Sequence, residues 1–229
     1  GCHFMANWME RDTAGLIHGL QVIRDRAQQQ GGRHREKEYW PSGLVKKGHF
    51  HLIGMAGPVV LVTEGYATGA SLHEATGLPV AVAFDANNLE PVAATLRKRH
   101  KLSRFLICAD DDETQKCRQP DCRQRVWLSD GPECGHCHKL HQAINAGVMS
   151  ASLAAMAVNG AWIQPLFEDQ AGRRNAWLQH GSKLNDFNDL HVAEGLHVVR
   201  AQVEARLLEL GWRAHGKAAR AESGTGGGV

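Results

Sequence analysis

The stretch "FLICADDDET" (105–114) joins an apolar run directly to three adjacent aspartates. The apolar half has the composition of a strand that is buried on both faces of a sheet. Asp110, Asp111 and Asp112 carry like charges that repel one another, so a fold keeps them together only if something positive neutralises them. The obvious candidate is a divalent cation such as Mg²⁺ or Mn²⁺, which prefers hard oxygen ligands. We therefore expect a metal site at the end of this strand.

Apolar runs and helical patterns alternate on both sides of this stretch. The predicted strands are residues 59–62, 79–84, 104–109 and 161–167. The predicted helices are residues 66–77, 89–100, 143–160 and most of 189–212. Alternation of this kind predicts a parallel sheet with right-handed crossovers. The expected fold class is therefore α/β, with a Rossmann-like parallel sheet of about four strands flanked by helices.

The remaining parts of the chain differ from this α/β pattern in composition. Short β-prone runs, separated by Gly, Pro and charged turns, lie at 16–23, 36–40 and 48–54. The glycine-rich C-terminal residues have too little apolar content to fold. The predicted division is a small strand-rich unit (1–57), an α/β domain (58–212) that contains an insertion (113–142), and a flexible tail (213–229).

Bulk properties set limits on the class of protein. The 229 residues carry a formal net charge of +2, so the overall charge does not demand a nucleic-acid partner. No apolar run reaches the length of a membrane span, and we expect a cytoplasmic protein without a membrane partner. Four of the six cysteines fall between 117 and 137 with metal-ligand spacing, which favours zinc in a reducing compartment over disulfides.

These four cysteines form two close pairs within the insertion. The pairs are Cys117-x4-Cys122 and Cys134-x2-Cys137, separated by eleven residues. Four thiolates on two turns are the ligand set of a tetrahedral structural Zn²⁺. The insertion is therefore predicted to be a zinc ribbon.

The predicted zinc ribbon also carries basic and aromatic residues. Arg118, Arg123 and Arg125, together with Trp127, are candidates for contacting the phosphates and bases of a single nucleic-acid strand. The alternative is a purely structural role, in which zinc holds together an insertion that would not fold without it.

A candidate acidic ligand also follows a second predicted strand. In open parallel sheets, ligands bind beyond the carboxyl ends of the strands. Glu64 follows the apolar run at 59–62 and faces Asp110 and Asp112 if the two strands are neighbours. Asp110 and Asp112 are two residues apart and point to the same side of a continuing strand, whereas Asp111 points away. The alternative is that such an aspartate only caps the next element.

Three stretches together resemble the Toprim domain, and more narrowly the Toprim domain of plasmid- and phage-encoded DNA primases. They are "LVTEGYATGASLHEATGLPVAVAFDANNL" (61–89), "LICADDD" (106–112) and "NDFNDLH" (185–191). The resemblance matches the family's Glu-Gly motif to Glu64 and its Asp-x-Asp motif to Asp110 and Asp112. It matches a later acidic motif to Asp186 and Asp189. The zinc-ribbon insertion departs from the family pattern.

The resemblance implies an enzyme that acts on phosphodiester bonds with Mg²⁺ or Mn²⁺. Glu64, Asp110 and Asp112 would be catalytic, and these three residues with Asp186 and Asp189 would ligate the metal. Glu64 would either join the ligands or act as a base. A primase would hold a ribonucleoside triphosphate and activate a 3′-hydroxyl. This implies short RNA primers made on single-stranded DNA in plasmid or phage replication or conjugation, with a replicative helicase as a further candidate partner.

Two other functions are compatible with these residues: a metal-dependent Toprim nuclease, and a non-catalytic module that binds nucleic acid through its zinc ribbon. The segment "VKKGHFHLIG" (45–54) resembles the basic segment ahead of the Toprim core in primases. Lys46 and Lys47 are therefore candidates for contacting nucleotide phosphates, and a solvated turn is the alternative. The basic segment favours a primase, because a primase needs a surface for template and nucleotides.

Overall fold

A five-stranded sheet forms the centre of the protein. The computed structural model describes residues 5–11, 17–23, 37–141 and 144–213. The sheet has the strand order β10–β7–β5–β6–β4, and its first four strands are parallel. The parallel strands are β5 (Val59–Thr63), β6 (Val80–Val82), β7 (Arg104–Cys108) and β10 (Ala161–Ile163). The predicted parallel sheet of about four strands is confirmed.

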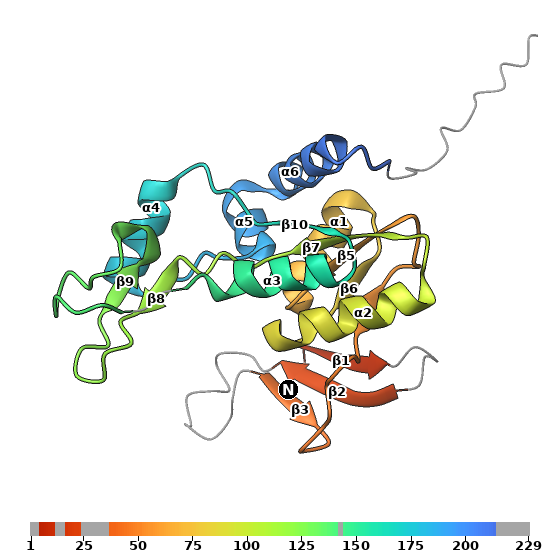
Figure 1. Ribbon diagram of the computed structural model, residues 1–229, viewed down its shortest axis with the longest axis horizontal. Coiled ribbons are helices and arrows are strands. Elements are labelled where there is room, and N and C mark those ends of the chain that lie inside the picture. Colours follow the sequence, from red (N-terminus) through yellow and green to blue (C-terminus); the bar gives the residue numbers. More distant parts are fainter. Residues whose placement is uncertain (1–4, 12–16, 24–36, 142–143, 214–229) are drawn as a thin grey trace, which may run out of the picture.

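Helices cover both faces of this sheet (Figure 1). On one face lie α2 (Leu89–Arg99) and α3 (Ala146–Ala157). On the other lie α1 (Tyr66–Thr76), α5 (Phe187–Glu194) and α6 (Leu196–Glu209). The helical stretch predicted over 189–212 is thus two helices, separated at Gly195, where φ is 97°. The fold is a three-layer α/β/α arrangement.

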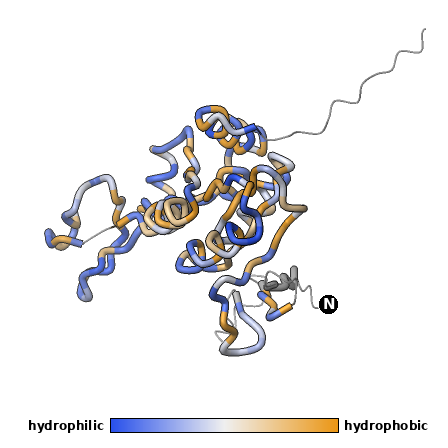
Figure 2. The backbone as a smooth tube through the Cα atoms, turned by 45° about the vertical axis from the view of Figure 1, so that its right-hand side comes forward, coloured by the Kyte–Doolittle hydropathy of each residue, from blue (hydrophilic) through white to orange (hydrophobic). Residues whose placement is uncertain are grey.

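The buried strands explain why the sequence shows continuous apolar runs. In β5, Val60 and Val62 pack with α2 and α3, whereas Val59 and Leu61 pack toward α1, α5 and α6. Successive side chains of a strand point to opposite faces, so both sets must be apolar when both faces are covered. Figure 2 shows hydrophobic segments gathered in the body of the molecule, while the arm on the left is mostly hydrophilic.

The fifth strand of the sheet differs from the sequence-based expectation. The run at 48–54 was expected in the N-terminal unit, but β4 (His51–Ile53) pairs antiparallel with β6 at the edge of the central sheet. The backbone groups along the outer side of β6 would otherwise lack partners, and an added strand covers them. The boundary predicted at residue 57 therefore falls after a strand of the central sheet.

The N-terminal residues form a separate antiparallel sheet. Its strands are β1 (Met5–Arg11), β2 (Ile17–Ile23) and β3 (Lys37–Trp40), in that order. Sequence analysis expected β2 and β3 but not β1. In Figure 1 this sheet lies below α2. It contacts the central domain through Tyr39, whose hydroxyl donates to the carbonyl oxygen of Phe84 at 2.9 Å.

The insertion forms an arm that projects to the left in Figure 1. It contains a hairpin of β8 (Thr114–Lys116) and β9 (Arg125–Trp127), followed by a short 3₁₀ turn, η3 (Leu128–Asp130). Beside it lie α4 (Gln170–Asn175) and a π-helical turn, η4 (Ala176–His180), which sequence analysis did not predict. Except for Arg213, the predicted tail lies outside the described residues. No helix in the described ranges is long and apolar enough to cross a membrane.

Candidate functional site

The acidic residues gather at the carboxyl edge of the central sheet. Strands β5 and β7 are neighbours, with Thr63 paired to Cys108. Glu64 directly follows β5, and Asp110 lies two residues beyond β7, so both stand at the same edge. Both residues are half-buried. The first and third predicted strands are thus neighbours, which is the condition under which Glu64 was expected to face the aspartates.

Asp112 is held at the start of α3. One carboxylate oxygen accepts a hydrogen bond from the backbone N–H of Gly147 at 3.0 Å, and the other accepts one from Nδ2 of Asn185 at 3.3 Å. Its own backbone N–H donates to Oδ1 of Asn145 at 3.0 Å. The N-terminus of a helix favours negative charge, because its first N–H groups lack partners within the helix. These contacts therefore fix the position of the Asp112 side chain at the start of α3.

Gly147 allows α3 to approach the acidic loop this closely. A Cβ atom added at this position would lie 2.2 Å from the carbonyl oxygen of Asp110. Any side chain there would displace either the helix or the loop. The glycine in "NAGVMS" therefore serves the geometry of the site.

Asn145 joins the two ends of the insertion. Its Oδ1 accepts from the N–H of Val148, which makes it the N-cap of α3, and also from the N–H of Asp112. Its Nδ2 donates to Oδ1 of Asp111 at 2.7 Å. An asparagine ahead of an alanine-rich helix is a recognisable cap signal, so this residue could have been predicted as a cap. Its contacts with the acidic loop could not have been predicted from the sequence.

Asp111 forms a buried ion pair with Arg173 of α4. Nη1 of Arg173 lies 2.7 Å from Oδ2 of Asp111, and Nη2 donates to the backbone carbonyl of Asp111 at 3.0 Å. Nε of Arg173 donates to the carbonyl of Leu184. The guanidinium also lies over the rings of Trp127 in β9 and Phe167, at 5.1 and 4.7 Å from their centroids. Sequence analysis missed Arg173, which no local spacing marks.

The third acidic segment also meets the loop. The backbone N–H of Asp111 donates to the carbonyl of Asn185 at 2.7 Å. Asp186 is the N-cap of α5, where Oδ1 accepts from the N–H of Asp189 at 2.8 Å, and its Oδ2 accepts from the hydroxyl of Thr68 in α1 at 2.8 Å. The structure thus brings together the three parts of the chain that carry the predicted acidic ligands.

Asp186 and Asp189 form a reciprocal capping box. Oδ2 of Asp189 accepts from the backbone N–H groups of Asn185 and Asp186. Burial raises the pKa of Asp189, and the neighbouring charge of Asp186 raises it further. These contacts assign both residues a role in starting α5. Their predicted role as metal ligands stays a prediction.

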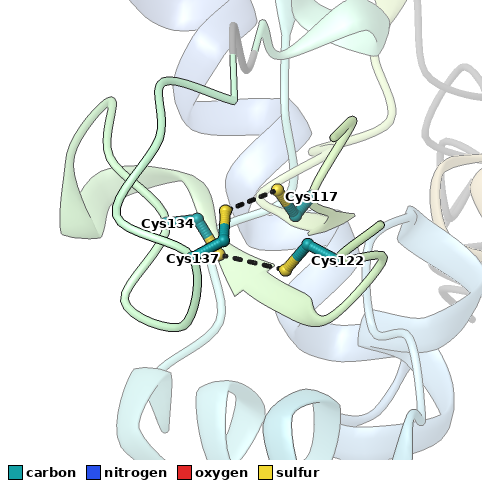
Figure 3. Close-up of side chains that lie close together, drawn as sticks. All are labelled: Cys117, Cys122, Cys134 and Cys137. Atoms are coloured by element: carbon teal, nitrogen blue, oxygen red, sulfur yellow. Dashed lines mark hydrogen bonds between the residues drawn. The ribbon is translucent and has the colours of Figure 1, made fainter. Parts of the chain in front are cut away.

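The four cysteines of the insertion converge on one point. Figure 3 shows their side chains pointing toward one another from two segments of the arm. Sγ of Cys117 lies 3.8 Å from Sγ of Cys137, Sγ of Cys122 lies 3.7 Å from Sγ of Cys134, and all four atoms lie within 4.8 Å of one another. Four sulfurs at about 2.3 Å from one Zn²⁺ stand about 3.8 Å apart in a tetrahedron. The cluster therefore fits zinc.

The thiols of this cluster differ in acidity. Burial acts to raise the pKa of Cys134, but hydrogen bonds from the backbone N–H groups of Cys137 and His136 and from the thiols of Cys122 and Cys117 together outweigh it, and the pKa falls to about 7. Burial raises the pKa of Cys117 to about 12. One thiolate therefore forms readily near neutral pH, and metal binding must displace the other protons.

In the described part of the chain, Glu64, Asp110 and Asp112 do not converge into a comparable group.

The predicted nucleic-acid contacts lie in two separate places. Lys46 and Lys47 line a cavity of about 450 Å³ beside the start of α2. Nζ of Lys46 is paired with Oδ2 of Asp85 at 2.9 Å and lies 4.4 Å from the centroid of the Tyr39 ring, whereas Lys47 is exposed.

The predicted ribbon arginines lie far along the chain from these lysines. Arg118 and Arg123 are exposed. Arg125 is half-buried and donates from Nη1 to the carbonyl of Leu178 at 3.2 Å, so part of its hydrogen-bonding capacity serves the packing of the ribbon.

Comparison with known proteins identifies the family. The sequence matches the Toprim domain over residues 59–197, and the chain belongs to the Toprim domain family. It is similar to two proteins of Escherichia coli, both named DNA primase TraC. One is 32% identical and the other 33% identical, each over 127 residues that make up 53% of this chain. The matched part is 10% of the first relative and 7% of the second, so the chain spans a small fraction of their length.

Two solved structures share a distant likeness with the fold. A DNA primase domain from Pseudomonas aeruginosa has a TM-score of 0.48 and 16% identity, covering 86% of this chain and 50% of that one. A DnaG primase catalytic domain bound to single-stranded DNA has a TM-score of 0.46 and 15% identity, covering 87% of this chain and 50% of that one.

Proposed function

We propose that this chain is the catalytic Toprim portion of a DNA primase that synthesises short RNA primers on single-stranded DNA. The observation that carries the proposal is the placement of Glu64, Asp110 and Asp112 at one edge of neighbouring parallel strands in a Toprim protein similar to DNA primase TraC. The setting would be plasmid or phage replication or conjugation in the cytoplasm. A replicative helicase is the further partner we propose.

The donor set at this edge fits a hard divalent cation. Asp110 and Asp112 offer carboxylate oxygens, which suit Mg²⁺ or Mn²⁺, and Glu64 stands at the same edge. Asp112 is held in place by Gly147 and Asn185, so its orientation does not depend on a ligand. Asp110 and Asp112 are proposed as the principal metal ligands.

When bound, the cation would neutralise phosphate charge and favour ionisation of the attacking 3′-hydroxyl. That oxygen would form a bond to the α-phosphorus of a ribonucleoside triphosphate while the bond to pyrophosphate breaks. Glu64 would either complete the ligand set or accept the hydroxyl proton. Asp186 and Asp189 at the start of α5 would be further metal ligands, and Lys46 and Lys47 would contact phosphates from the N-terminal side.

We further propose that the four cysteines hold a structural Zn²⁺. The support is the tetrahedral spacing of their sulfur atoms. The zinc would order the arm, which consists of a two-stranded hairpin and turns and has only a small apolar cluster of its own.

Primer synthesis tests the proposal directly. The purified chain is incubated with single-stranded DNA, labelled ribonucleotides and Mn²⁺, and the products are separated on a denaturing gel. We expect labelled oligoribonucleotides from the wild type and none from Asp110→Asn or Asp112→Asn. Glu90→Gln, which neutralises an exposed carboxylate in the first turn of α2, is the matched control and should retain synthesis. Degradation of the DNA in place of synthesis would identify a nuclease and overturn the proposal.

A further inference from the structure

A cleft of about 380 Å³ lies where the insertion meets the central domain. It is lined by Asp112 of the acidic loop, by Thr114 and Lys116 of β8, and by Arg118 beyond that strand. Trp177 of the π-helical turn and Lys183 also line the cleft. The cleft thus shares one wall with the proposed catalytic site.

The charge of the cleft is strongly asymmetric. Three cationic side chains, Lys116, Arg118 and Lys183, line it together with one carboxylate, that of Asp112. All three cations are exposed, and none of them forms a salt bridge with another described residue. Cations gathered in a concave surface reinforce one another's potential and attract anions. An anionic ligand would supply the missing counter-charge.

The wall of the cleft is held rigidly. Nε1 of the buried Trp177 donates to the backbone carbonyls of Val126 at 2.9 Å and Gln115 at 3.2 Å, which fixes the π-helical turn against both strands of the hairpin. Nζ of Lys183 lies 5.8 Å from the centroid of the Trp177 ring. The side-chain oxygen of Thr114 is buried and has no hydrogen-bond partner within the described ranges. A fixed aromatic wall is a feature of a binding site, whereas the Thr114 hydroxyl is too deeply buried to contact a ligand in the cleft.

We propose that this cleft binds the phosphate groups of a nucleotide or of a nucleic-acid strand and holds them beside Asp112. The inference rests on the proposed function, in which Asp112 ligates the catalytic metal. A phosphate held by Lys116, Arg118 or Lys183 would lie next to that metal and share its charge. Phosphate groups of this kind occur in two ligands, the backbone of a single nucleic-acid strand and the triphosphate of an incoming nucleotide.

The cleft is better suited to this role than the cavity beside α2. There, Lys46 already has a carboxylate partner in Asp85 at 2.9 Å. In the cleft, by contrast, the cations outnumber the one carboxylate, and that carboxylate is hydrogen-bonded to Gly147 and Asn185. Binding an anion in the cleft therefore requires no ion pair to be broken.

Charge-matched double variants test the inference. Lys116→Gln with Lys183→Gln removes two cations of the cleft, and Lys98→Gln with Lys101→Gln removes two exposed cations at the end of α2 and in the following turn. Fluorescence anisotropy is measured with a labelled oligothymidylate, and separately with a fluorescent ATP analogue, across a series of salt concentrations. The two probes distinguish a strand from a nucleotide as the ligand.

We expect the cleft variant to bind at least one of the two probes about tenfold more weakly, with the control variant close to wild type. If the ligand is the strand, the slope of log affinity against log salt should fall by about 1.4, because each phosphate contact on a single strand contributes about 0.7. Equal affinities and slopes for the two double variants, with both probes, would overturn the inference. Primer synthesis by the wild type is measured in a separate assay. If the cleft variant loses binding but the wild type synthesises no primers, the proposed function is refuted and the inference about the cleft stands.

Discussion

Nη1 of Arg173 lies 2.7 Å from Oδ2 of Asp111, and the two side chains are only 1% and 5% exposed. The pair joins α4 to the middle of the acidic loop. Because the Arg173 guanidinium also lies over the ring of Trp127, the same residue connects the loop to the inserted ribbon. The central aspartate of "ADDD" therefore has a structural role.

Loss of Arg173 should destabilise the protein strongly. Arg173→Met leaves the carboxylate of Asp111 buried without its partner, and breaking a buried pair in this way costs about 3–5 kcal/mol. Arg174→Met is the control, because the neighbouring arginine pairs with Asp130 at the surface, where such a pair contributes at most about 1 kcal/mol. Urea denaturation gives both free energies of unfolding. Similar losses for the two variants would contradict the structural role of Arg173.

The ribbon should contain about one zinc ion per chain, as expected for four thiolate ligands. Cys134→Ser should release the metal and increase hydrogen exchange in residues 113–141, while the central sheet stays protected. Cys108→Ala is the control, because Cys108 lies in the core of β7 and outside the cluster. Metal analysis and hydrogen exchange are the measurements. Protein purified without chelators that contains no zinc would rule out the site.

Metal binding at the acidic edge should appear in thermal stability. Mn²⁺ at about 100 times its dissociation constant should stabilise the wild type by about 2.7 kcal/mol through mass action. Asp112→Asn should respond much less, although its side-chain oxygen can still accept from Gly147 and keep α3 in place. Glu64→Gln should lose activity but keep more of the metal response. Melting curves with and without Mn²⁺ are the measurement. An identical rise in melting temperature for wild type and Asp112→Asn would count against the metal site.

The Lys46–Asp85 pair gives a pH-dependent prediction. Burial acts to raise the pKa of Asp85, but hydrogen bonds from Lys46 and from the N–H of Asn87 outweigh it and lower the pKa. A lowered pKa in the folded state adds stability above the ordinary pKa of an aspartate, and this stability is lost as pH falls through the lowered value. Lys46→Met should therefore raise the pKa of Asp85 and destabilise the protein at neutral pH but not in strong acid.

The control for this prediction is Lys47→Met. Lys47 is exposed and forms no ion pair with the described residues, so its loss should leave the pKa of Asp85 close to the wild-type value. NMR titration of the Asp85 carboxyl in the three proteins is the measurement. Equal shifts in both variants would mean that Lys46 acts only through its general positive charge.

The sequence predicted the structure correctly where a local pattern of residues determines it. The apolar runs of β5 and β7 placed Glu64 and Asp110 at strand ends, and the spacing of the cysteines identified their cluster. The pairing of β4 was not predictable in this way, because a strand of three residues is assigned to a sheet by its tertiary neighbours.

The role of Arg173 illustrates the same limit within the site. It is 62 residues from Asp111 in sequence, and nothing in "AGRRN" distinguishes it from its exposed neighbour Arg174. Only the fold shows that one of the two arginines is buried between aromatic rings and the other is on the surface. Long-range ion pairs of this kind leave no periodic signal in a sequence.

The hydrogen bonds of Asn145 have a consequence for how this protein family can vary. They close the chain of the insertion at its base, 33 residues after Asp112, so the positions of the loop ends do not depend on the path between them. For such a closed loop, doubling the number of residues adds only about 0.6 kcal/mol of closure entropy. Lineages could therefore lengthen, shorten or exchange the distal turns of the arm while the acidic edge of the central sheet retains its shape.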